Sequence, residues 1–298
     1  MKILKDFISK KKEKVISLSN KEIEDLKTLI KSLDIRLKND EISSGEYKEL
    51  KQKYEHKLEE QINLIKEKSL LRGLSYISIS GSGKVTDSQI NISGSGHVEG
   101  WRGGSISISG SGSISDEEIR ISGSGTLPGD MKTEKLVVSG SFKANGALEA
   151  NSFTASGSFK IDGPLTVHEK LNLSGAGKIE GSVSAENAAL NCSGALKING
   201  NLTCFDAEIN GTFKINGDVN CSKFTCGLED KSSIEGNLIC LGDIYIEQEK
   251  RKGTLTVNQI ISEGKVYLEG VKADYVIGTS VKIGPNCEIK NFEEKTEN

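Results

Sequence analysis

Apolar and polar residues alternate through most of the chain, and glycines interrupt the alternation at regular intervals. Period-two alternation indicates strands, because neighbouring side chains of a strand point to opposite faces. One glycine column recurs with a nearly constant period of about 18 residues: Gly146, Gly163, Gly181, Gly200, Gly217 and Gly236. A second column, with a similar period, runs through Gly140, Gly157, Gly175, Gly194 and Gly211. A fixed period of this kind indicates a repeat architecture, and three short strands per coil predict a triangular β-solenoid.

The same register predicts which side chains fill the solenoid. Each coil has room for about two inward residues on each of its three strands, and these positions are aliphatic. One predicted core column stands two positions after each glycine of the first column: Leu148, Leu165, Val183, Leu202, Val219 and Leu238. Another stands two positions before the glycines of that same column: Ile161, Ile179, Ile198, Ile215 and Ile234.

The block before the regular coils has a related but different pattern. The pentapeptide Ile-Ser-Gly-Ser-Gly recurs from Ile79, Ile92, Ile108 and Ile121, at spacings that are shorter and less even. We expect shorter coils or half-coils here. At about 18 residues per coil, residues 75–289 give about 12 coils in all.

The segment 1–72 contains a single glycine, Gly45, and is rich in Lys, Glu and Leu, which favours helix. Ser19 with Glu22, and Ser43 with Glu46, form two capping-box patterns. They predict helices over about 20–37 and from about 44 onward, joined as an α-helical hairpin. The apolar residues along one face of each predicted helix have a roughly heptad spacing, so these helices could also pair between chains as a coiled coil. The expected domains are a basic amphipathic start and hairpin at 1–72, a solenoid at 73–290 and a disordered tail at 291–298.

Composition and charge indicate the cellular compartment in which we expect the protein. The formal net charge is −3, with +4 over residues 1–72 and −7 over residues 73–298. No apolar run is long enough to span a bilayer, and nothing at the N-terminus is typical of a cleaved signal. The six cysteines contain no CxxC pair, which fits reduced thiols. We therefore expect a cytoplasmic protein.

Catalytic chemistry has little support in the sequence. The three histidines, His56, His97 and His168, stand in unrelated contexts, and no nucleotide-binding or hydrolase motif is present. Cys204, Cys221 and Cys240 share one inward column, where small core residues are the favoured interpretation over a metal or redox site. We expect no catalytic, cofactor or metal site.

The first residues form the best candidate for a membrane contact. Four apolar side chains share one helical face, and lysines surround them: Ile3, Leu4, Phe7 and Ile8, with Lys10, Lys11 and Lys12. A short basic amphipathic helix binds anionic lipid through apolar burial and charge. The alternative is that this face packs against the following helices.

A lysine precedes the inward isoleucine in successive coils, giving an expected exposed basic column of Lys143, Lys160, Lys178, Lys197 and Lys214. Such a column could bind an acidic partner. We favour a solvated face that opposes lateral sheet pairing, a role to which lysine is suited. Nucleic acid is not an expected partner, because the solenoid is net negative.

The glycine-cornered repeat, its Asn/Asp/Glu-Gly turns and the closing run from Val276 to Ile289 resemble the bactofilins, over about residues 75–290. The resemblance implies a right-handed parallel β-helix that assembles end to end into filaments without nucleotide, often on the inner face of the cell membrane. Residues 40–50 also resemble the turn of the helical hairpins called SHOCT domains.

The predicted function is therefore a nucleotide-independent, self-assembling cytoskeletal scaffold with itself as partner, not an enzyme. Two alternatives stay open: a β-solenoid that binds partners without polymerising, and an envelope-stress or adhesin-like protein. A remote third is a hexapeptide-type acyltransferase, suggested by the run from Ile283 to Cys287. No histidine stands near that run to act as general base.

Overall fold

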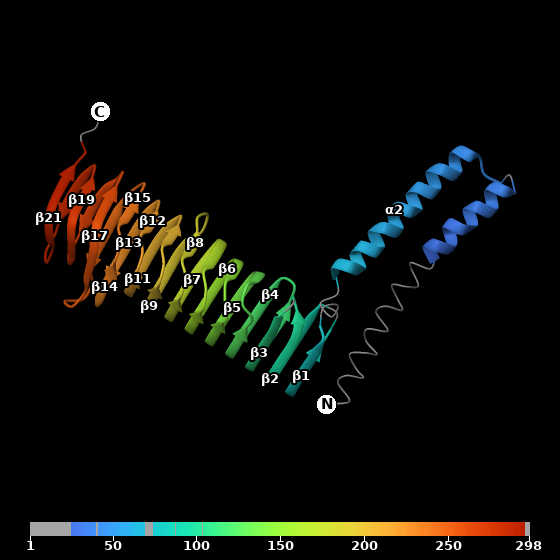
Figure 1. Cartoon of the computed structure of the whole chain (residues 1–298), viewed down its shortest axis with the longest axis horizontal. Helices are drawn as coiled ribbons and strands as arrows, with labels where there is room; N and C mark the ends of the chain where they lie inside the picture. The colour runs from blue at the N-terminus through green and yellow to red at the C-terminus, as the bar shows by residue number, and fades with distance from the viewer. Residues whose placement is uncertain (1–24, 40, 69–73, 87, 103, 296–298) are drawn as a thin grey trace.

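The computed structural model describes residues 25–39, 41–68, 74–86, 88–102 and 104–295, with the backbone alone over 59–68. Its main feature is one continuous coiled sheet of 21 strands, which a helical hairpin precedes in the chain (Figure 1). The strands are β1 (Tyr76–Val85), β2 (Gln89–Trp101), β3 (Gly104–Ser115), β4 (Glu118–Leu127), β5 (Met131–Ala144), β6 (Leu148–Ile161), β7 (Leu165–Ile179), β8 (Val183–Ala185), β9 (Ala189–Ile198), β10 (Leu202–Cys204), β11 (Asp206–Ile215), β12 (Val219–Cys221), β13 (Lys223–Leu228), β14 (Lys231–Ile234), β15 (Leu238–Cys240), β16 (Ile244–Gln248), β17 (Thr254–Ser262), β18 (Lys265–Leu268), β19 (Val271–Gly278), β20 (Ser280–Ile283) and β21 (Glu288–Glu294).

The hairpin consists of helical residues 25–38 and of α2 (Ser44–Lys68). The second capping box forms as the sequence predicts: the Ser43 hydroxyl donates to the Glu46 carboxylate at 2.8 Å, and the Glu46 amide donates back to that hydroxyl at 3.3 Å. The Tyr47 hydroxyl donates to Asp34 at 2.6 Å and joins the two helices, beside buried Leu33. The first capping box, Ser19 with Glu22, lies outside the described residues.

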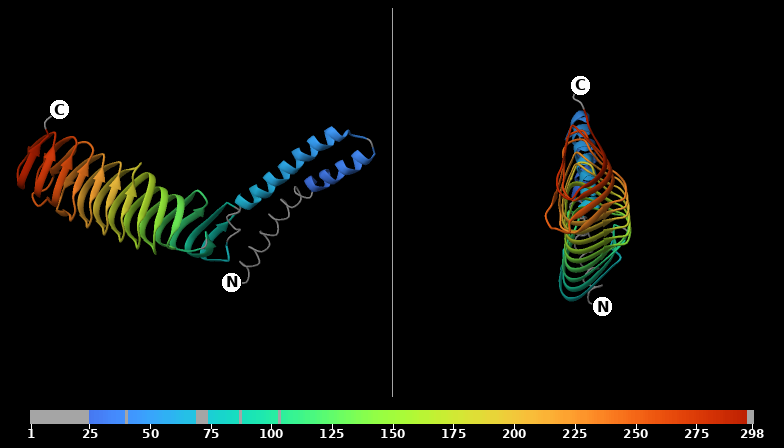
Figure 2. Two further views of the ribbon diagram at one scale, coloured as in Figure 1. Left: turned by 45° about the horizontal axis from the view of Figure 1, so that its top comes forward. Right: turned by 90° about the vertical axis from the view of Figure 1, so that its left-hand side faces the viewer.

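From β4 onward the sheet winds as a parallel solenoid, and its coils lie over one another when viewed along the rod (Figure 2). Each coil has three faces. In β9 and β11 one continuous strand crosses two faces, and a separate short strand such as β8 or β10 makes the third. Each face contributes two inward side chains, as in Val183 and Ala185 of β8. The predicted mainly β, triangular solenoid is confirmed.

One corner of the solenoid is a continuous column of nine glycines. They stand opposite one another in the strand registers, and all have φ between 107° and 135°: Gly81, Gly94, Gly110, Gly123, Gly140, Gly157, Gly175, Gly194 and Gly211. L-residues rarely adopt this backbone conformation. A Cβ on Gly157 would also overlap the carbonyl oxygen of Gly140 in the preceding coil. Glycine is therefore required at this corner for two independent reasons.

Two inward positions flank each corner glycine, and in several strands a large side chain at one accompanies a small one at the other. In β1 to β4 the residue two before the glycine is isoleucine and the residue two after is glycine: a Cβ on Gly83 would meet the Ile79 side chain at 2.7 Å. Where the first residue is small, as at Ala155, the second is Phe159, whose ring is buried. Beside Gly211 both Ile209 and Phe213 are buried, so the compensation holds for part of the column only.

The expectation of short coils in the first block is wrong. Strands β1 to β4 form an antiparallel meander, and parallel winding begins only between β4 and β5. The spacing of the pentapeptides is too short for a coil of three faces, which takes about 18 residues, but it suffices for a strand that crosses two faces and turns back. Around its central glycine, the repeated segment has apolar residues four positions before and four after, so it fits the core in either direction.

The meander reduces the number of coils to about 10, against the 12 expected. The end of the chain differs as well. A disordered tail was expected from residue 291, but β21 continues to Glu294, because Asn291 and Phe292 stand opposite Tyr275 and Val276 of β19. Residues 296–298 lie outside the described residues.

The glycine column leads to a stability prediction. We expect Gly157→Ala to lower the free energy of unfolding by ~1–3 kcal/mol, because a strained φ and an overlap with the Gly140 carbonyl both result. Ser156→Ala, at the adjacent exposed position, is the matched control and should change it by less than about 0.5 kcal/mol. Denaturant unfolding followed by circular dichroism measures both; equal effects would contradict the assignment.

Candidate functional site

Within the residues that the structure describes, no three His, Cys, Asp or Glu side chains gather as a metal site would require. None of the described helices is long and apolar enough to cross a membrane. The candidate functional features are therefore the surfaces and ends of the rod.

The predicted core columns lie inside the solenoid. All their members are at most 2% exposed: Leu148, Leu165, Val183, Leu202, Val219 and Leu238, and Ile161, Ile179, Ile198, Ile215 and Ile234. They stand opposite one another in successive coils, as in the pairs Leu202–Val219 and Ile198–Ile215. Their contribution is to the rigidity of the rod.

The predicted lysine column also forms a register-matched row, Lys143, Lys160, Lys178, Lys197 and Lys214. Acidic turn residues lie between several of its members. Asp162 contacts Lys143 at 3.0 Å and Lys160 at 2.5 Å. Glu180 contacts Lys178 at 2.5 Å, and Glu235 contacts Lys214 at 2.7 Å. These acids partly neutralise the row, so it offers an acidic partner less free charge than the lysines alone predict.

Hydrogen bonds from lysine hold the pKa values of Asp162 and Glu180 below their ordinary range: Lys160 first and then Lys143 for Asp162, and Lys178 for Glu180. A lowered native pKa gives stability that is present above the unfolded pKa and is lost as the pH falls. We expect the thermal unfolding midpoint to fall between about pH 6 and pH 3, and to fall less steeply in the double variant Asp162→Asn/Glu180→Gln.

The exposed position of these pairs makes the expected effect small and sensitive to salt. Glu117→Gln with Glu186→Gln, two exposed acids outside the lysine row, is the control. If the control flattened the pH profile as much as the test variant, the ion pairs of the row would not be its cause.

The cysteines occupy the core as small apolar residues. Cys204, Cys221 and Cys240 are buried, and the Cys221 and Cys240 sulfur atoms lie 3.0 Å apart as free thiols. Burial raises the pKa of the Cys192 thiol to about 11, and also raises the pKa values of Cys204 and Cys226. Because the thiolate is the reactive form, these groups are poor nucleophiles.

This predicts a simple thiol count. Of the six cysteines, Cys287 alone among those described is only partly buried, so one thiol per native chain should react with a thiol-specific reagent. All six should react after unfolding in denaturant. Rapid reaction of more than one thiol in the native protein would contradict the burial of the column.

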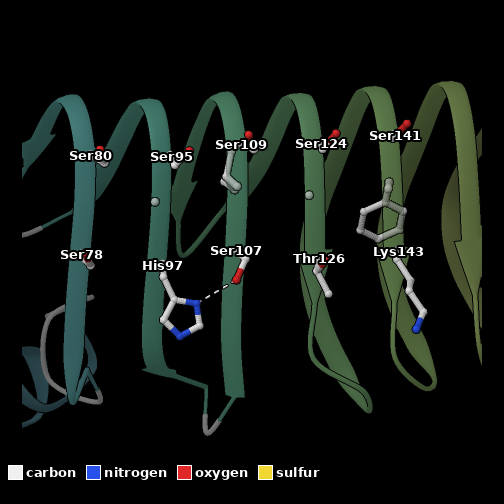
Figure 3. A pocket seen from close by; sticks show the side chains of 14 residues that line it. Ser78, Ser80, Ser95, His97, Ser107, Ser109, Ser124, Thr126, Ser141 and Lys143 are labelled. Carbon is white, nitrogen blue, oxygen red and sulfur yellow. Dashed lines mark hydrogen bonds between the residues drawn. The ribbon is translucent and has the colours of Figure 1, made fainter.

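A shallow groove of about 550 Å³ runs over β1 to β5 (Figure 3). Hydroxyl side chains repeat along it at each strand, as at Ser80, Ser95 and Ser109, and His97 hydrogen bonds to Ser107 at 2.8 Å. The other ring nitrogen of His97 contacts the Glu99 carboxylate at 3.2 Å, so a hydroxyl, an imidazole and a carboxylate lie in a row. Half of the Glu99 side chain is exposed, whereas the carboxylate of a catalytic triad is buried, and we assign this row no catalytic role. The groove shows instead how regularly the strands repeat up to β1.

A different strand lies at each end of the sheet. Strand β1 pairs with β2 on one side, and no described strand pairs with its other side. At the far end β21 pairs with β19, and its exposed face includes Phe292, 56% exposed. Unpaired strand edges can add further strands, whereas the sides of the rod have no free backbone row.

Residues of the acyltransferase-like run lie between β20 and β21, with Asn286 at a φ of 59°.

The candidate membrane residues cannot be placed. Ile3, Leu4, Phe7 and Ile8, with Lys10, Lys11 and Lys12, lie outside the described residues, so the predicted membrane contact stays a prediction. Sequence reasoning missed the antiparallel meander, and the one signal for a different winding was the short spacing of the Ile-Ser-Gly-Ser-Gly segments, which start at residues 79, 92, 108 and 121.

The fold is a rod-shaped β-solenoid whose two end strands each have an edge that no described strand covers. Residues 103–197 match the family model described as bactofilin, polymer-forming cytoskeletal. The match covers about a third of the chain, mainly β3 to β9, and the bactofilin resemblance is thereby confirmed. It indicates a polymer-forming cytoskeletal scaffold, and the family is a structural one. Neither the curated proteins nor the solved structures gave a match to the chain.

Proposed function

We propose that this protein is a self-assembling scaffold whose solenoids join end to end and need no nucleotide. The observation that carries the proposal is a strand edge at each end of a continuous sheet that no strand of the described residues covers. Backbone pairing across such an edge adds hydrogen bonds of the kind already present between coils. The match to a polymer-forming family over residues 103–197 supports this proposal.

The sides of the rod are less suited to assembly. A charged row of lysines and acids runs along one corner, and charged side chains oppose edge-to-edge or face-to-face sheet association. Exposed apolar side chains do occur there, such as Phe205 at 53% exposure. End-to-end contact is therefore favoured over lateral contact.

Two exposed phenylalanines allow the two contacts to be separated. We expect Phe292→Glu, on the last strand, to weaken assembly by at least tenfold in critical concentration. Phe205→Glu, between β10 and β11 on the side of the rod, is the matched control and should leave assembly unchanged. Negative-stain electron microscopy and pelleting, without nucleotide, measure both.

Three results would contradict the proposal. Dispersed rods of the unaltered full-length protein at all protein and salt concentrations would show that it is a non-polymerising scaffold. Loss of assembly in Phe205→Glu alone would show lateral association. Filaments that form only after ATP or GTP is added would contradict nucleotide independence.

We also propose that the N-terminal residues bring the assembled scaffold to the inner face of the cell membrane. The support is the pattern of four apolar residues among lysines at positions 3–12. Few apolar residues bind lipid weakly, but many copies on one polymer bind together.

Co-sedimentation with anionic phosphatidylserine vesicles tests the membrane contact. The full-length protein should bind, and the variant Phe7→Ser/Ile8→Ser should bind at least tenfold less. Equal binding of the two, or equal binding to neutral phosphatidylcholine vesicles, would contradict it.

A further inference from the structure

The turn that follows the lysine row has asparagine in some coils and an acid in others. Two positions after each lysine of the row, and once after Ser233, stand the turn residues Asn145, Asp162, Glu180, Asn199, Asn216 and Glu235. The acids contact the lysines beside them, as Asp162 does with Lys160 at 2.5 Å. Each turn residue precedes a glycine of the first column, so every asparagine here begins an Asn-Gly dipeptide.

An Asn-Gly dipeptide can lose its side-chain amide without an enzyme. The backbone nitrogen of glycine attacks the side-chain carbonyl carbon of asparagine and forms a C–N bond that closes a succinimide ring. The bond from that carbon to the side-chain nitrogen breaks, and ammonia leaves with the glycine N–H proton. Water then opens the ring at one of its two carbonyl carbons, which gives aspartate or isoaspartate. Glycine favours the first step because no side chain obstructs its nitrogen, and asparagine is accordingly a thermolabile residue.

Hydrogen bonds hold the side-chain amides of two of the four Asn-Gly dipeptides in the chain. The Asn199 nitrogen donates to Glu180, and the Asn199 oxygen accepts from the Asn216 nitrogen at 3.4 Å. The Asn210 oxygen accepts from the Gly227 amide at 3.2 Å. Asn199 and Asn210 must give up these bonds before the carbonyl carbon can turn toward the backbone, so attack is slowed. Among the described residues the Asn216 side chain has only the 3.4 Å contact, so Asn216 is intermediate.

Asn145 is different, because nothing in the described part of the chain holds its side chain. The side chain is exposed and has no hydrogen-bond partner there, and the Gly146 N–H likewise donates to no described group. The backbone N–H of Asn145 donates to the Leu127 carbonyl at 3.2 Å, so the turn itself stays in place. We propose that Asn145 deamidates spontaneously in the folded protein, and that folding suppresses the same reaction at Asn199 and Asn210.

The two products have opposite effects on the coil. Aspartate at position 145 fits, because Asp162 at the equivalent position of the next coil contacts the lysine of its own coil, and a carboxylate at 145 reaches Lys143 in the same way. Isoaspartate lengthens the backbone of the turn by one methylene group. Gly146 lies so close to Gly129 that an added Cβ would stand 2.7 Å from the Gly129 Cα, so the turn has no room for a longer backbone. The isoaspartate form is therefore the less stable one.

Peptide mapping by mass spectrometry tests this ranking on the full-length protein. Samples are stored at mildly alkaline pH in native buffer or in denaturant, and isoaspartate is counted by labelling with an isoaspartyl methyltransferase. In native buffer we expect Asn145 to react at least tenfold faster than Asn199 and Asn210, with Asn216 between them. In denaturant the four rates should differ by less than threefold, because the hydrogen bonds are gone.

Removal of one acceptor tests the cause of the protection. Glu180→Ala takes away the partner of the Asn199 amide and should speed the reaction at Asn199 at least threefold, while Asn145 keeps its rate. Glu235→Ala is the matched control. This acid occupies the same turn position and contacts Lys214, and no asparagine amide of the described residues donates to it. Its removal should change neither rate.

A second variant tests the loss of stability. Asn145→Gln keeps the amide, but a glutamine side chain closes the corresponding ring far more slowly. After equal storage, the thermal unfolding midpoint of the unaltered protein should fall as isoaspartate accumulates, whereas the midpoint of Asn145→Gln should stay constant. An equal fall in both proteins would overturn the assignment of the damage to this turn.

The outcomes separate this inference from the proposed function. Equal native rates at the four dipeptides, or a faster reaction at Asn199 than at Asn145, would overturn the inference. A tenfold ranking that persists in denaturant would overturn folding as its cause. The rates are measured whether or not the rods assemble, so neither result bears on the proposed scaffold function.

Discussion

The close approach of backbone to backbone at one glycine corner is the constraint on which the rest of the structure depends. Nine glycines with φ of 107° or more stack there, and the space where a Cβ would stand is taken by a carbonyl oxygen of the neighbouring strand. This corner fixes where each strand bends and therefore which residues face inward. Parallel and antiparallel strands share it, so one column of glycines joins two different topologies in a single sheet.

The corner also explains the unusual composition of the core. Beside many of these glycines a large inward side chain accompanies a small one, as in Ile79 with Gly83 and Ala155 with Phe159. Small cysteines fit the same thin interior on another face, at Cys204, Cys221 and Cys240. The narrow interior of the coil favours small residues such as glycine, alanine and cysteine. The buried thiols are therefore explained by their size, without a chemical role.

Much of this could be predicted from the sequence, because a nearly constant repeat period leaves little freedom. The inward columns, such as Leu148 to Leu238, and the row of lysines from Lys143 to Lys214 follow from counting positions from one glycine to the next. The direction of β1 to β4 could not be obtained in that way. Period-two alternation is the same in both directions, and the isoleucine–glycine symmetry acquires its meaning only when strand pairing is known. The acidic partners of the lysines, Asp162 and Glu180, depend on side-chain reach between coils, which spacing alone does not give.

In the proposed assembly, the protein is a rod whose sheet continues from one molecule into the next. X-ray fibre diffraction from aligned assemblies of the full-length protein tests that claim most directly. Strands that run across the axis of a continuous solenoid should give a reflection at ~4.8 Å along the filament axis. The same reflection perpendicular to that axis would mean that rods lie side by side across the filament, and it would contradict end-to-end continuation of the sheet.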